Sequence, residues 1–195
     1  MKNREYISCL RTYILIITTI FILSIMMGLV VSINSPYIAE DYLKIFEKSF
    51  GWIKTLDPFV IMIIIFLNNA IKSLLAILMG IAFGFIPLIF VAGNGVLIGM
   101  LINIIAKEKG SFFVIAALLP HGIIEIPMVL ISASIGLRLG YNMYLSLKGE
   151  ETSIKTELKQ GIGLYVRWIA PLLLLAAIIE TFVTPLVVFR ISFNI

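Results

Sequence analysis

The apolar run from Phe59 to Ala106 sets the strongest limit on how this chain can fold. As one straight helix it would be about 72 Å long, at a rise of about 1.5 Å per residue. The hydrocarbon core of a bilayer is about 30 Å thick, so the run has to fold back at least once. Only 13% of the residues are charged and 61% are hydrophobic, far from the balance of soluble domains. The sequence therefore predicts an integral membrane protein.

The fold-back is expected at the Gly93-Asn94-Gly95 tripeptide, because glycine and asparagine tolerate backbone angles that interrupt a helix. The segment after it, residues 96–106, is then short for a crossing and is predicted to be a half-helix, ended by the charged "KEKG". Residues 96–119 either cross the membrane twice or dip into it and return. Five passes follow from the first alternative, and four from the second.

Residues 12–33 form an uncharged run that is predicted to be a retained first span. The run is longer than a signal-peptide core, and no small-residue cleavage pattern follows it. Basic residues precede the run and acidic residues follow it, which predicts that the N-terminus is cytoplasmic. The expected location of the protein is the cell membrane. The polar stretch Lys148 to Gly161 is expected to be a cytoplasmic loop. Residues 162–190 are then the last span, with the C-terminus outside.

Residues 36–57 carry apolar side chains at helical spacing among charged ones, which predicts an amphipathic helix at the membrane surface. Trp52 is the expected interface anchor. The alternative is a helix that simply packs over the bundle. Together with residues 59–147 and 162–190, these segments fit one integral membrane domain over residues 1–195, with no length left for a second folded domain.

The fold class is thus all-α, a polytopic transmembrane helix bundle with broken or half helices around the Gly-Asn-Gly and Pro-His-Gly segments. Glycines four residues apart, Gly136 with Gly140 among them, predict close helix contacts, because van der Waals packing drives helix association in lipid. The basic residues behind the net charge of +4 are expected to orient spans and not to bind nucleic acid. Expected partners are the lipid bilayer, further copies of the chain, or other membrane or envelope proteins.

The chain has one histidine, His121, and Glu125 follows it one helical turn later on the same face. A second intramembrane acid, Glu180, lies in the last span. Ionisable side chains are costly in the bilayer and normally face a bundle interior or a wet cavity, so these three residues form the candidate polar site. The amides expected to join the site are those of Asn68, Asn69 and Asn94. The residues expected to break or perturb the helix around His121 are Pro120, Gly122 and Pro127.

Three uses of such a site stay open on the residues alone. The side chains could lock broken helices together through buried hydrogen bonds, handle a ligand or proton, or catalyse hydrolysis. Catalysis is the least favoured, because a zinc enzyme usually needs three protein ligands and no HExxH motif or activated nucleophile is present. We therefore expect no catalytic residue, no metal and no cofactor.

Four segments carry a resemblance to a known family. They are "NNAIKSLLAILMGIAFGFIP", "GNGVLIG", "PHGIIEIPMVLISASIGLRLG" and "IIETFVTP", which follow in this order between Asn68 and Pro185. They resemble landmarks of the stage II sporulation protein M family of polytopic membrane proteins. The resemblance singles out eight residues, whose chemical roles it leaves unassigned: Asn68, Asn69, Asn94, His121, Gly122, Glu125, Pro127 and Glu180.

In spore-forming bacteria, the family's namesake is a membrane scaffold that localises peptidoglycan-degrading partners. The resemblance thus implies a scaffold or assembly factor that organises partners at the membrane. Family members also occur in organisms without peptidoglycan, so the shared activity is expected to be broader than that role. The alternative is a transporter or channel-like component that uses the His/Glu site, and an intramembrane hydrolase is the third hypothesis.

Overall fold

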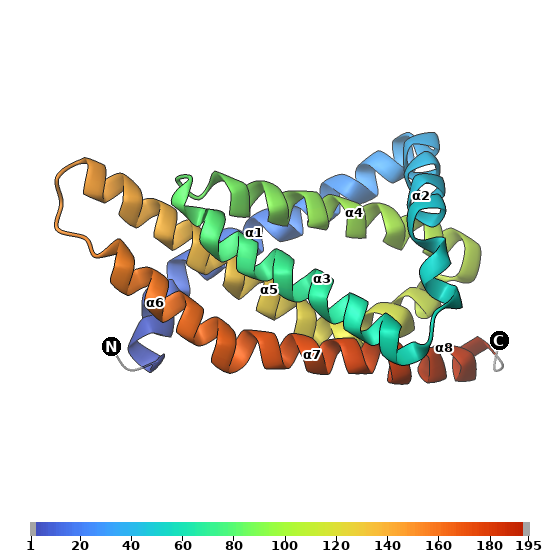
Figure 1. The fold of residues 1–195 in the computed structure, drawn as a ribbon. Coiled ribbons are helices and arrows are strands. Elements are labelled where there is room, and N and C mark those ends of the chain that lie inside the picture. Colours follow the sequence, from blue (N-terminus) through green and yellow to red (C-terminus); the bar gives the residue numbers. More distant parts are fainter. Residues whose placement is uncertain (1–2, 193–195) are drawn as a thin grey trace.

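The computed structural model describes residues 3–192, and all of its regular elements are helices (Figure 1). They are α1 (Asn3–Asn34), α2 (Pro36–Phe50), η1 (Gly51–Thr55), α3 (Pro58–Leu78), η2 (Met79–Ile81), α4 (Phe85–Lys109), α5 (Ser111–Leu147), α6 (Ile154–Leu164), η3 (Tyr165–Ile169), α7 (Ala170–Ile178), η4 (Ile179–Val183) and α8 (Thr184–Ser192). The predicted all-α helix bundle is confirmed.

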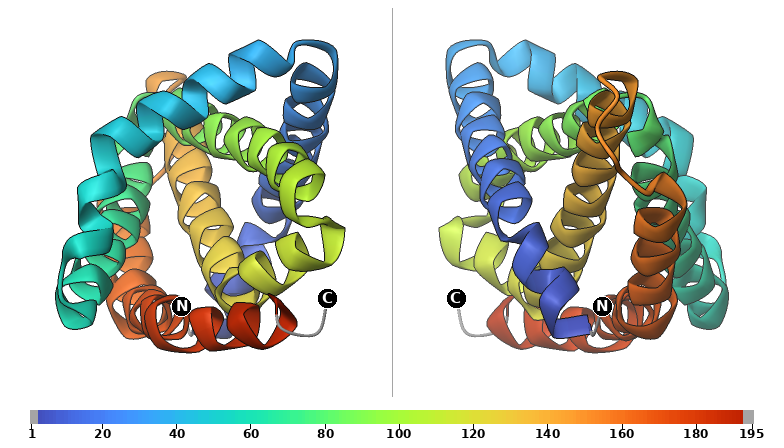
Figure 2. Two further views of the ribbon diagram at one scale, coloured as in Figure 1. Left: turned by 90° about the vertical axis from the view of Figure 1, so that its right-hand side faces the viewer. Right: turned by 90° about the vertical axis from the view of Figure 1, so that its left-hand side faces the viewer.

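Five helical segments of the described chain are long and apolar enough to cross a membrane. They are Tyr6–Asn34, Pro58–Ile81, Phe85–Lys109, Ser111–Leu147 and Ile154–Arg190. The fourth span, α5, packs against α1, α3, α4 and the helices of the last span. Figure 2 shows α5 between the other spans, and Figure 1 shows the two chain ends at opposite ends of the bundle, as an odd number of passes requires. The side on which each terminus lies stays a prediction.

The fold-back in the long apolar run lies at residues 79–84, and its predicted position at Gly93-Asn94-Gly95 is wrong. Phe83 and Gly84 turn the chain there with positive φ angles of 54° and 76°. Asn94 lies within α4, where its amide donates a hydrogen bond of 2.7 Å to the Phe90 carbonyl one turn earlier. Residues 96–106 are the second half of a full-length span, so neither a half-helix nor a re-entrant segment is present there.

The glycines of α4 serve close packing and not a turn. A Cβ atom at Gly95 would lie 2.7 Å from the Ser24 Cβ, and one at Gly99 would collide with the Ile25 carbonyl oxygen, both on α1. On α5, a Cβ at Gly136 would meet the Ala76 carbonyl oxygen, and one at Gly140 would meet the Gly84 nitrogen. Glycine at these positions therefore lets α1 approach α4, and lets α5 approach α3 and the 79–84 turn, at backbone distance.

The α5 helix is continuous through Pro120, His121 and Gly122, so the predicted break at the Pro-His-Gly segment is also wrong. A proline removes only one backbone donor, and neighbouring helices in a membrane bundle can compensate for it. The irregular backbone lies in the last span instead. Its two π-helical turns, η3 and η4, each end two residues before a proline, Pro171 and Pro185. A π turn fits there because proline cannot donate the regular helical hydrogen bond.

Two further segments position the ends of the bundle. A helix does occupy much of residues 36–57, and α2 crosses one end of the bundle between α1 and α3 (Figure 2). Its Ala39 and Leu43 pack against α4, while Ile45 is 64% exposed. Whether α2 lies at a lipid interface stays a prediction. The last span begins at Ile154, inside the stretch expected to be a loop, and the Ser153 hydroxyl caps it.

Candidate functional site

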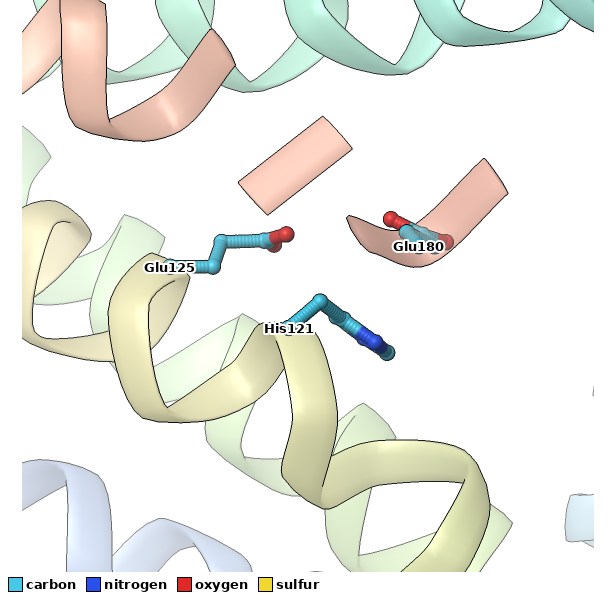
Figure 3. A group of neighbouring side chains, drawn as sticks. All are labelled: His121, Glu125 and Glu180. Atoms are coloured by element: carbon cyan, nitrogen blue, oxygen red, sulfur yellow. The ribbon is translucent and has the colours of Figure 1, made fainter. Parts of the chain in front are cut away.

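The structure brings His121, Glu125 and Glu180 together inside the bundle (Figure 3). One ligand atom from each side chain lies within 4.8 Å of the other two. His121 and Glu125 lie one turn apart on α5, and Glu180 faces them from η4 of the last span. All three side chains are half-buried. We call these three residues the polar triad.

Thr184, the first residue after the π turn η4, lies beside the imidazole of the triad. The Thr184 hydroxyl donates a hydrogen bond of 3.2 Å to the Ile179 carbonyl, five residues earlier, and lies 3.5 Å from Nδ1 of His121. Because the hydroxyl proton is directed to Ile179, its lone pairs face the imidazole. This arrangement favours the tautomer with a proton on Nδ1 and leaves the Nε2 lone pair available to a ligand.

A cavity of about 110 Å³, lined by both polar and apolar side chains, adjoins the triad. It lies among α1, α3, α4 and α5, and Glu125 is a member of both the cavity wall and the triad. The other polar side chains of the wall are Asn68, Asn69, Asn94 and Lys72. The structure therefore places the three amides predicted from the sequence beside Glu125. Asn68 and Asn69 lie within the second span, and the Asn68 amide donates a hydrogen bond of 3.3 Å to the Asn69 side chain.

Glu125 is the electrostatic centre of this region. Its carboxyl group experiences the positive charge of Lys72 across the cavity and the carboxyl group of Glu180 within the triad. Its Oε2 atom is buried and has no hydrogen-bond partner among the described residues. A carboxylate in that state is costly in a low-dielectric interior unless a cation or donor approaches it. The arrangement therefore suits binding of a positively charged group.

The remaining residues singled out from the sequence frame the site and do not enter it. Pro120 and Pro127 lie within α5 on either side of the triad residues, and Gly122 is buried in the same helix. A Cβ atom at Gly93 would meet no heavy atom within 4 Å, whereas one at Gly95, Gly136 or Gly140 would meet atoms of a neighbouring segment. These last three glycines therefore serve close packing.

A second ionic group, absent from the predicted site, lies toward the start of α1. Arg138 Nη2 is 3.2 Å from Glu157 Oε2, and the Tyr6 hydroxyl donates a hydrogen bond of 2.7 Å to Glu157 Oε1. Glu157 is only 5% exposed. The sequence does carry a signal for it, because Glu157, Gly161 and Leu164 recur at helical spacing and all three are buried on one face of α6. This network joins α1, α5 and α6.

Comparison with known proteins identifies the matching family. The model of the stage II sporulation protein M family matches residues 17–185, a range that contains the polar triad and the cavity. An uncharacterized protein of the archaeon Methanocaldococcus jannaschii is 39% identical over 126 residues, which cover 61% of this chain and 68% of the relative. No solved structure matches the chain. The match extends the resemblance seen from Asn68 to Pro185 into the first span.

Proposed function

This chain belongs to the stage II sporulation protein M family, and we propose that it moves a small cation through its helix bundle. The observation that carries the proposal is the position of Glu125, which is shared between the polar triad and the adjoining cavity. Polar side chains thereby form one connected region across four spans. A purely structural lock would need the hydrogen bonds of its members to be satisfied, and Glu125 Oε2 has no such partner among the described residues.

The depth of this region supports a transport role. Asn68 lies ten residues, and His121 also ten, from the first residue of their helices, or about 15 Å along each axis. That distance is about half the thickness of a hydrocarbon core, so both residues would lie near the bilayer centre if their helices begin at the membrane surface. Ionisable groups at this depth that face a bundle interior commonly mark ion or solute pathways. Two carboxyl groups and one imidazole select for a cation over an anion.

The test is cation flux into sealed proteoliposomes that contain the purified chain. Vesicles loaded with a pH-sensitive dye or with a divalent-cation dye would report protons and metal ions separately under an imposed membrane potential. We expect flux by the wild-type chain and its loss in Glu125→Gln and Glu180→Gln. The matched control is Glu108→Gln, which neutralises an exposed carboxyl group at the end of α4. Wild-type flux no greater than that of empty vesicles for either dye, or flux unchanged in both triad variants, would contradict the proposal.

A scaffold or assembly role is the second candidate, and one observation favours it. Tyr37 and Trp52 are 66% and 57% exposed on α2 and η1, outside the five candidate spans. Exposed aromatic side chains of this kind are frequent anchors of protein partners. In this role, Trp52→Ala would abolish crosslinking of a discrete membrane partner to a photoreactive group at residue 37, and His121→Ala would preserve it. Crosslinking that persists in Trp52→Ala and is lost in His121→Ala would count against a scaffold role.

A further inference from the structure

The geometry points to a binding site for one divalent transition-metal ion, with His121, Glu125 and Glu180 as its ligands. This inference deepens the proposed cation movement, on which it rests, by naming the class of cation. It departs from the sequence-based expectation of no metal, which followed from the lack of an HExxH motif and of an evident set of three zinc ligands in the sequence. The sequence placed Glu180 in the same candidate polar site, but it could not give the distance between this acid and Glu125, which lies 55 residues earlier in the chain.

The spacing of the donor atoms suits a metal ion. Zinc binds imidazole nitrogen and carboxylate oxygen at about 2.0 to 2.2 Å, so its ligand atoms in a tetrahedral site lie about 3.4 Å from one another. The three donor atoms of the triad lie within 4.8 Å of one another. Each donor would have to move inward by less than about 1 Å to reach bonding distance. Rotation of the flexible glutamate side chains can supply such a movement without displacement of either helix.

The contact at Nδ1 of His121 fits a metal ligand as well. Metal-binding histidines almost always use their second ring nitrogen in a hydrogen bond that fixes the tautomer. Here the Thr184 hydroxyl lies 3.5 Å from Nδ1, and its own proton is directed to the Ile179 carbonyl. The Nε2 lone pair is then free to accept a metal ion. Thr184, which directly follows the π turn that supplies Glu180, would be the outer support of this ligand.

Charge balance gives a third, independent argument. Two carboxylates and one neutral imidazole neutralise a divalent ion, so the complete site carries no net charge in the low-dielectric interior. Glu125 Oε2, which has no hydrogen-bond partner among the described residues, could coordinate the ion. Lys72 lines the same cavity as Glu125, and its positive charge partly compensates the negative charge of the Glu125 carboxylate when no metal is bound.

The donor set also narrows the choice of metal. Imidazole suits zinc, iron, nickel and copper, and carboxylates suit manganese, magnesium and calcium. A mixed set of one nitrogen and two oxygen donors favours Zn²⁺, Fe²⁺ and Mn²⁺ over the alkaline-earth ions. Three protein ligands leave at least one position for water, as in open zinc sites. An open position permits the exchange that transport of the ion would need.

The first experiment measures binding by the full chain, purified without a polyhistidine tag in detergent and stripped of metal with a chelator. Titration with Co²⁺, whose visible absorption reports nitrogen and oxygen ligation, should saturate at one equivalent per chain. Addition of Zn²⁺ should displace the cobalt and abolish the absorption. Failure of the folded wild-type chain to bind Co²⁺ saturably, or a cobalt spectrum without nitrogen ligation, would overturn the inference without recourse to any variant.

The second experiment assigns the ligands. His121→Ala, Glu125→Gln and Glu180→Gln should each weaken Co²⁺ binding by on the order of 100-fold, since loss of even an outer-sphere partner costs 10- to 100-fold. Glu108→Gln should bind as the wild type does. Glu180→Asp retains the carboxyl group on a shorter side chain and is expected to fold, with a shifted cobalt spectrum and weaker binding. The assignment would be overturned if Glu180→Asp, and those of the three ligand variants that fold, bound Co²⁺ with the affinity of the wild type.

The experiments can refute the transport proposal and the metal-site proposal independently of each other. Stoichiometric metal binding in detergent with no flux in proteoliposomes would retain the metal site and exclude transport. Proton flux that depends on Glu125 and Glu180, from a chain that binds no Co²⁺, would retain cation movement and exclude the metal site.

Discussion

Replacement of Glu157 by leucine is expected to destabilise the bundle by about 3 kcal/mol, although the sequence around this residue is typical of a polar loop. The Glu157 side chain is 5% exposed and that of Arg138 is 15% exposed, so the substitution would leave a largely buried guanidinium without its counter-ion. Removal of one partner of a buried ion pair costs about 3 to 5 kcal/mol. We expect the lower end, because Arg138 keeps some solvent contact and still lies 5.1 Å from the centre of the Tyr6 ring.

Two further variants separate the contributions of the hydrogen bond and of the ion pair to the stability of this network. Tyr6→Phe removes one hydrogen bond to a charged acceptor, which is worth about 1.5 to 3 kcal/mol, and leaves the ion pair intact. The double variant Arg138→Met with Glu157→Leu removes both charges. It should recover most of the loss, because apolar side chains of similar volume often replace a buried pair at little cost. Coupling between the two sites is the difference between the double variant and the sum of the single ones.

The assay is equilibrium unfolding of the purified chain in mixed detergent micelles with a rising fraction of dodecyl sulfate, followed by circular dichroism. Glu157→Gln, which keeps the shape of the side chain, serves as a second probe of the lost charge. The reasoning is refuted if Glu157→Leu unfolds within about 0.5 kcal/mol of the wild type, or if the double variant is no more stable than Glu157→Leu. Either result would mean that water, and not Glu157, compensates the Arg138 charge.

Three further predictions concern packing, the triad and topology. Gly99→Leu should destabilise the bundle by about 1 to 3 kcal/mol in the same assay, since its side chain would meet the Ile25 carbonyl, whereas Gly93→Leu, with open space around it, should be neutral. Lys72→Met should tighten Co²⁺ binding by removal of a competing positive charge, with a modest effect because Lys72 is exposed and its charge is partly screened; unchanged affinity would mean that this charge does not act on Glu125. In a Cys9→Ser background, single cysteines at the exposed positions 108 and 150 should react with an impermeant thiol reagent from opposite sides of sealed vesicles; labelling from the same side would contradict five passes.

Much of the site could be anticipated from the sequence, and its assembly could not. The four-residue spacing of His121 and Glu125 places both on one helix face whatever the surrounding fold, because the α-helical period alone fixes that relation. Glu180 joins them only because the last span packs against α5 and presents its π turn there. No local pattern encodes such a long-range approach. The same is true of Lys72, which enters the cavity wall through the packing of α3.

The sequence by itself determined that the chain crosses a membrane as apolar helices. The length of an apolar segment is a local property of the sequence, and it can be compared directly with the thickness of the hydrocarbon core. Only the tertiary structure decided what each glycine does. Gly95 and Gly84 belong to similar apolar glycine-containing segments, yet Gly95 lies in a helix against α1 and Gly84 turns the chain. Conformational freedom permits either use, and the contact made by the neighbouring helix selects between them. Packing between the helices therefore decided where the long apolar run folds back and which polar side chains come together.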